Sequence, residues 1–143
     1  MESRYLYRAK RVDNGKWVEG FYFCMTHPDG RHTHHFIIPL GADLSLGTPI
    51  EKIQVEVDPS TICQCTGLVD KNGKLIWKND IVRHYNDEEH PESYCIGVVL
   101  WDDNYAGFYR TDNKYRDEKP RISNRCRYEV IGNTFDNPEL LEV

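Results

Sequence analysis

The sequence predicts a mainly β protein. Short apolar runs rich in aromatic and β-branched residues recur along the chain, and Tyr, Phe and Trp together make up 12% of it. Turn dipeptides such as Asn14-Gly15 and Asn72-Gly73 separate these runs. No segment carries the periodicity of a long amphipathic helix. These observations favour a small barrel or sandwich of short strands.

The N-terminal part predicts a β-hairpin. Two aromatic-rich runs, near residues 4–12 and 16–23, flank the Asp13-Asn14-Gly15 turn. Asn-Gly is typical of a type I′ turn, in which both central residues have a positive φ.

Residues 27–35, HPDGRHTHH, predict a polar loop with a turn at Asp29-Gly30. The apolar run at residues 36–38 follows it and stops at a proline. Residues 51–58 then alternate, with Ile53, Val55 and Val57 on one side, and so predict a half-buried strand.

A short helical turn at Pro59 should lead from this strand into a second hairpin. Asn72-Gly73 forms the turn of that hairpin, and a tight turn at Asn79 leads into the next strand. The remaining predicted elements are strands at residues 81–85, 94–101, 105–109 and 127–131 and a helical turn at 137–142. The run at 94–101 is apolar on both faces, which indicates a central strand.

Composition bounds the class of protein. The net charge of −5 gives no overall attraction to nucleic acid or to an anionic membrane. No stretch approaches the roughly 20 apolar residues of a membrane span, and the N-terminus lacks the apolar region of a secretory signal. Five scattered cysteines predict reduced thiols. We therefore expect a cytoplasmic protein that makes no contact with a membrane.

One segment, residues 110–127, is basic. Seven cations against three acids give it a charge of +4, which leaves −9 for the rest of the chain, and Tyr109, Tyr115 and Tyr128 are interleaved with the cations. Such a loop on a small β-barrel could contact nucleic acid, although charge runs usually form solvated connections, which is the favoured interpretation. The candidate nucleic-acid-binding residues are Arg110, Lys114, Arg116, Lys119, Arg121, Arg125 and Arg127.

Four histidines cluster in the predicted loop at His27, His32, His34 and His35. Histidine is a common ligand of zinc and nickel, so a metal-dependent activity is an alternative here. A solvated loop without metal is the favoured interpretation, because no second cluster supplies further ligands at a known spacing. The chain also lacks a G-x-S-x-G elbow and a glycine-rich phosphate loop. We therefore expect no enzymatic activity, no catalytic residues and no cofactor.

Three segments together resemble the YopX family of phage and prophage proteins. They are residues 8–22, residues 57–82 and residues 129–141, in an order and spacing that span almost the whole chain. The family often has Tyr where Cys65 stands and Gly where Asn79 stands. The resemblance implies a mostly β protein whose C-terminal part forms an SH3-type barrel. It implies no catalytic residues, and neither the histidine cluster nor the basic segment belongs to the family pattern.

Together, these inferences predict one YopX-like domain over residues 1–143, with an N-terminal β-hairpin region at 1–60, an SH3-like small β-barrel at 61–143 and few short helical turns. The expected function is that of a non-enzymatic phage or prophage accessory protein that acts by binding. Its partner is an unidentified protein or a second copy of the chain. The alternatives are a nucleic-acid-binding module and a metal-dependent activity.

Overall fold

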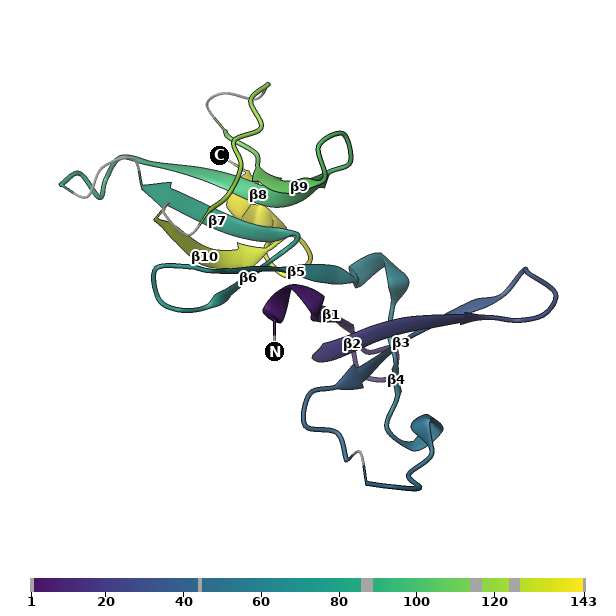
Figure 1. The fold of residues 1–143 in the computed structure, drawn as a ribbon. Coiled ribbons are helices and arrows are strands. Elements are labelled where there is room, and N and C mark those ends of the chain that lie inside the picture. The colour runs from purple at the N-terminus through teal and green to yellow at the C-terminus, as the bar shows by residue number, and fades with distance from the viewer. Residues whose placement is uncertain (1, 44, 86–88, 114–116, 124–126, 143) are drawn as a thin grey trace. The chain divides into compact units, whose positions relative to one another are not determined.

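The computed structural model describes residues 2–43, 45–85, 89–113, 117–123 and 127–142. The mainly β prediction is confirmed: the described residues form two antiparallel sheets, with strand orders β4-β3-β2-β1-β5-β6 and β10-β7-β8-β9 (Figure 1). The helical elements in this part of the chain are short 3-10 helices and none is an α-helix. The chain divides into two compact units, Met1–Gln64 and Cys65–Val143.

The first unit contains four strands and the beginning of a fifth. Their bounds are β1 Tyr7–Lys10, β2 Trp17–Thr26, β3 Thr33–Pro39 and β4 Val55–Glu56, and the 3-10 helices are η1 Ser3–Tyr5, η2 Ile50–Lys52 and η3 Pro59–Thr61. Ala9, Ile37 and Val57 are buried at the centre of this unit. The partly buried side chains packed around them are Tyr7, Val18, Tyr22, Val55 and Ile62.

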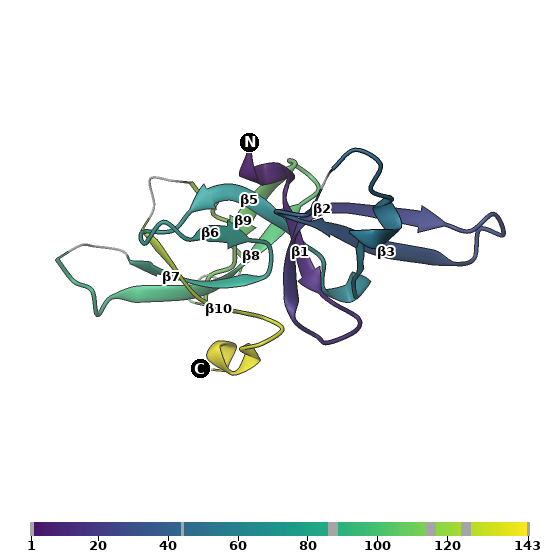
Figure 2. The same ribbon diagram turned by 90° about the horizontal axis from the view of Figure 1, so that it is seen from below.

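Strands β2 and β3 form a long hairpin. Strand β1 pairs only with residues 17–20 of β2, whereas β3 follows β2 out to the Thr26–Thr33 pair. Both views show these two strands continuing past the end of β1 (Figures 1 and 2). The predicted loop at 27–35 is therefore wrong over its last three residues, because β3 begins at Thr33 and continues through His34 and His35. Cross-strand pairing with β2 outweighs the polar character of these residues.

The predicted strand at 51–58 is wrong over most of its length. Residues 50–52 form η2, closed by a bond from the Ile53 N–H to the Ile50 carbonyl, and β4 has only two residues. Strand β4 pairs with β3 only at Phe36 and Ile37. The alternation of apolar residues does place Val57 in the core, but no strand among the described residues pairs with residues 51–54. The helical turn predicted at Pro59 is present as η3.

The two Asn-Gly turns occur where they were predicted, but they are not type I′ turns. Gly15 and Gly73 have φ values of +71° and +81°, whereas the described non-glycine residues with a positive φ are Asn79 and Ala106. In the second hairpin the Gly73 N–H donates to the Asp70 carbonyl at 3.0 Å, so a three-residue loop ends in a left-handed glycine. Asn79, with φ +70°, makes the predicted turn into β7.

In the second unit, residues of β5 (Cys63–Val69) pair with β6 (Leu75–Trp77). The four-stranded sheet contains β7 Asp80–Tyr85, β8 Tyr94–Asp102, β9 Gly107–Arg110 and β10 Tyr128–Asn133, and the 3-10 helix η4 spans Pro138–Leu141. The core of this unit contains Ile76, Val82, Val99, Ile122 and Tyr128.

Strand β8 is central, as predicted, because β7 and β9 flank it. Its two faces are not buried alike, however: Cys95, Gly97 and Val99 are buried, whereas the side chains between them are only half-buried. No closed barrel is detected in the described part of the chain, so the SH3-like barrel stays a prediction.

Candidate functional site

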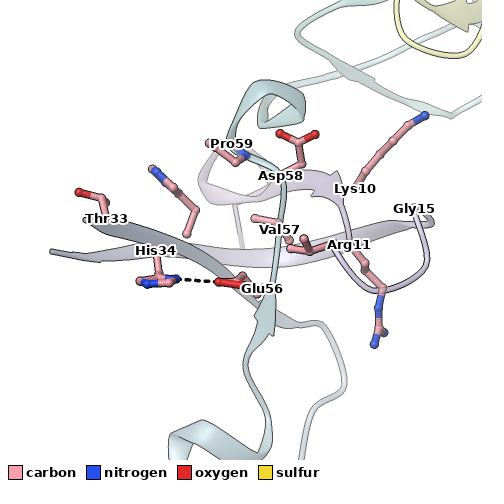
Figure 3. A pocket seen from close by; sticks show the side chains of 11 residues that line it. Lys10, Arg11, Gly15, Thr33, His34, Glu56, Val57, Asp58 and Pro59 are labelled. Carbon is pink, nitrogen blue, oxygen red and sulfur yellow. Dashed lines mark hydrogen bonds and ion pairs between the residues drawn. The ribbon is translucent and has the colours of Figure 1, made fainter. Parts of the chain in front are cut away.

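A pocket of about 410 Å³ lies in the first unit (Figure 3). Three segments supply its walls: the end of β1 with the turn that follows it, the start of β3, and residues 56–59. The lining residues are Lys10, Arg11, Val12, Gly15, Thr33, His34, His35, Glu56, Val57, Asp58 and Pro59.

Backbone hydrogen bonds fix the walls of this pocket. The Val57 N–H donates to the His35 carbonyl at 2.9 Å, and the Asp58 N–H donates to the Lys10 carbonyl at 2.9 Å. The Val12 N–H donates to the Glu56 carbonyl at 3.1 Å. The segment 56–58 is therefore tied to β3 on one side and, on the other, to the last residue of β1 and to Val12 after it.

The charged side chains of the pocket are paired with one another or with neighbours. His34 Nδ1 lies 2.7 Å from Glu56 Oε1, as the dashed line in Figure 3 marks. Arg11 binds both carboxylate oxygens of Asp13, at 2.9 and 2.8 Å, and this pairing lowers the pKa of Asp13. The Ser60 side chain and backbone N–H donate to Asp58, lowering the pKa of that carboxyl.

An apolar stripe occupies one face of the β2–β3 hairpin. Strand register places Phe21 opposite Ile38 and Phe23 opposite Phe36, with Met25 following on the same face. The Phe23 and Phe36 rings stack with centroids 5.2 Å apart, while Phe21 and Met25 remain 42% and 53% exposed. A hollow of about 220 Å³ continues the stripe, lined by Met25, Thr26, His27, Pro28, His34 and Phe36. The alternation in residues 21–25 could have revealed this stripe in the sequence, but our sequence reasoning did not identify it.

The outer edge of β2 beyond Gly20 has no neighbouring strand among the described residues. The bonds from the His27 N–H to the His32 carbonyl and from the Leu40 N–H to the Glu19 carbonyl show that odd-numbered β2 residues bond to β3. In an antiparallel pair the even-numbered residues then point their N–H and C=O groups outward. We call the backbone groups of Tyr22, Cys24 and Thr26 the free edge.

Three of the four clustered histidines share the face of the apolar stripe. The His27 ring centroid lies 6.0 Å from that of His32 and 5.2 Å from that of His34. His32 Nδ1 is 3.0 Å from Asp29 Oδ2. His35 lies on the opposite face, where its Nδ1 meets the Tyr22 hydroxyl at 2.6 Å. In this side-chain arrangement, no group of three or more His, Cys, Asp or Glu residues in the described ranges is placed to hold a metal ion.

Four of the seven candidate nucleic-acid-binding residues are described, and the other three, Lys114, Arg116 and Arg125, lie outside the described residues. Arg110 is only 8% exposed and donates to Asp112 at 3.1 Å. Lys119 Nζ lies 3.1 Å from Asp102 Oδ2, a pairing that raises the pKa of Lys119. Arg127 is exposed.

Two cations of this segment also cover the rings of tyrosines that precede it. Arg121 lies 4.4 Å above the centroid of the Tyr105 ring, and Lys119 lies 5.4 Å above that of Tyr109. The structure thus brings cations and tyrosines together here, but each of these rings already has a cation on one face. Nucleic-acid binding by this segment stays a prediction.

Comparison with known proteins places the chain in a family context. A family model described as YopX protein matches residues 6–142. No curated protein matches the chain. Among solved structures, the crystal structure of protein EF1440 from Enterococcus faecalis is similar, with 25% sequence identity and a TM-score of 0.55. The similarity covers 94% of this chain and 96% of that one, so it extends over both units.

Proposed function

The chain belongs to the YopX family, and from this membership we propose that it is a phage or prophage accessory protein that binds another protein in the bacterial cytoplasm and catalyses no reaction. The phage origin and the SH3-like form of the second unit are what the family resemblance implies. The observation that carries the binding role is the apolar stripe of the β2–β3 hairpin together with the free edge beside it.

An exposed apolar stripe at the side of an unpaired strand is typical of a protein-binding surface. Aromatic residues and methionine are enriched at the cores of protein interfaces, and contiguous apolar patches on a surface often mark binding sites. Residues 20–26, GFYFCMT, contain neither a charged residue nor a proline. Lysine and proline are the residues that usually prevent unwanted pairing at a strand edge. This edge is therefore open to an added strand.

The partner that fits this surface is an extended segment of another protein. Its backbone would pair with the free edge at Tyr22, Cys24 and Thr26, and alternate apolar side chains would cover the stripe. In this mode of recognition the backbone hydrogen bonds supply affinity and the side chains on one face supply specificity. A partner of this kind needs no preformed cavity.

The test is capture of partners from prophage-bearing host cells, with and without nuclease, followed by binding measurements with the purified partner. Cys24→Pro removes an outward N–H without touching the bonds to β3, and Met25→Lys places a charge in the stripe. Cys24→Ser is the matched control, because it keeps both features. We expect a nuclease-resistant protein that binds the wild type and Cys24→Ser equally and binds the other two variants at least ~10-fold more weakly.

Other outcomes would contradict the proposal. A partner that binds all four proteins alike would show that the hairpin is not the binding surface. A partner lost on nuclease treatment would favour nucleic-acid binding by the basic segment, and its affinity should then fall as salt rises. Capture of the chain's own copies alone would favour self-association.

A further inference from the structure

We propose that His27, His32 and His34 together form a binding site for a divalent transition metal ion, with zinc as the ion to test first. This site goes beyond the proposed protein-binding role. It depends on the β2–β3 hairpin, which aligns histidines that the sequence alone placed in a loop.

Strand register brings the three rings to one face of the hairpin. His27 and His32 are joined across the turn by a backbone bond of 2.8 Å, and His34, two residues after His32, lies on β3 opposite Met25. Residues two apart on a strand point to the same face. The centroids of His27 and His34 are 5.2 Å apart, and those of His27 and His32 are 6.0 Å apart. Two imidazoles that share one tetrahedral zinc ion have centroids about 5 Å apart, given zinc–nitrogen bonds of about 2.1 Å.

Carboxylates orient two of these histidines as they do in metal sites. Asp29 Oδ2 lies 3.0 Å from His32 Nδ1, and Glu56 Oε1 lies 2.7 Å from His34 Nδ1. An ionised carboxylate can only accept a hydrogen bond, so Nδ1 of each ring carries the hydrogen. In a ring that carries its hydrogen on Nδ1, Nε2 is the nitrogen that can bind a metal. A carboxylate behind a ligating histidine is the usual outer partner of such ligands.

Metal binding would require the three imidazole rings to rotate until they point at one ion. They do not converge on one point in the structure, but the side chains of His32 and His34 are 69% and 47% exposed. Exposed side chains change rotamer within nanoseconds, so small ring rotations are accessible. Three histidines leave the fourth tetrahedral position for water or for a ligand. His35 is excluded, because it lies on the other face and bonds to Tyr22.

The experiment is isothermal titration calorimetry with zinc chloride at neutral pH on the full chain. We expect one zinc ion per chain, with affinity at least ~10-fold lower in His27→Ala and in His34→Ala because each removes a ligand. Glu56→Gln, which keeps the ligand but removes the outer carboxylate, should weaken binding about 10-fold. His90→Ala is the matched control, since His90 is also exposed and its Nδ1 also lies near a carboxylate, 3.1 Å from Glu92.

Circular dichroism should show that every variant keeps the fold, because the altered side chains are exposed. Absence of zinc binding to the wild type would overturn the proposal. So would an affinity unchanged by His27→Ala and His34→Ala, or an equal loss in His90→Ala, which would indicate non-specific binding to surface histidines. A long-range nitrogen–hydrogen spectrum of the imidazoles provides an independent readout: zinc should shift the Nε2 signals of His32 and His34 and leave those of His90 unchanged.

Discussion

At the scale of single residues, Asp70 joins two distant parts of the second unit. It is 5% exposed. Its Oδ1 accepts from the backbone N–H groups of Asn72 and Lys74, both at 2.9 Å, and its Oδ2 accepts from that of Val130 at 3.0 Å. Burial acts to raise the pKa of this carboxyl, but the three backbone donors together outweigh it and the pKa is lowered. The Asp70 carboxylate thus holds the β5–β6 turn to β10.

Asp70→Asn should destabilise the protein by about 1–3 kcal/mol, because the new amide group would face one of the backbone N–H donors and leave it unsatisfied. Chemical denaturation measures the change. Asp103→Asn is the control: that carboxylate is exposed and accepts one bond, from the Trp101 ring nitrogen. Equal stability of the Asp70 variant and the wild type would contradict the role of Asp70.

The pH dependence of stability has a definite sign. Because the pKa of Asp70 is lower in the folded state, its stabilising contribution is complete above the unfolded value, about 3.9. The contribution is lost as pH falls through the folded pKa. The stability difference between the wild type and Asp70→Asn should therefore shrink below about pH 4. The sequence could suggest a turn at Asp70, but not the bond to Val130, which is 60 positions away.

At the scale of elements, a substitution at Gly73 tests whether this residue forms the turn of the second hairpin. Its φ is +81°, and no heavy atom lies within 4 Å of the position that a Cβ would occupy. Substitution therefore costs backbone strain and no clash. Gly73→Val should lower stability by about 1–3 kcal/mol, since a β-branched residue resists this conformation. Gly73→Asn should cost less, because asparagine tolerates a positive φ. Thermal melting of both variants would show the order, and equal melting temperatures would rule it out.

Local patterns predicted the elements whose pairing is also local. The hairpin turns, the turn at Asn79 and the helical turn at Pro59 follow from residues adjacent in sequence. The prediction of a strand over residues 51–58 was wrong because a strand there needs a partner, and the partner depends on how far β3 extends. An alternation of apolar residues carries no information on the length of a distant strand. The prediction of a loop at the histidine segment was wrong for the opposite reason. Residues 33–35 have the polar character of a loop, but a strand partner is present, and pairing with β2 makes them a strand. From the sequence, the histidines of the candidate zinc site could be predicted only to be close together. Which of them share a face depends on the register of β2 with β3.

At the scale of the whole molecule, the exposure of the cysteine side chains reports on the cores of both units. The structure places Cys63 and Cys65 at 0% exposure and Cys95 at 4%, whereas Cys24 is exposed on the hairpin. Cys63 belongs to the first unit, and Cys65 and Cys95 belong to the second. The fifth, Cys126, lies outside the described residues.

Brief alkylation of the native protein, followed by peptide mapping, should therefore modify Cys24 first. Cys63, Cys65 and Cys95 should react at least ~100-fold more slowly, because a reagent reaches them only when the surrounding strands open. Denaturant should abolish this difference, which serves as the control for intrinsic reactivity. Rapid labelling of Cys95 alone would mean that the second unit opens readily, and rapid labelling of Cys63 would mean the same for the first. Slow labelling of all three would show that the cores of both units stay closed in the native protein.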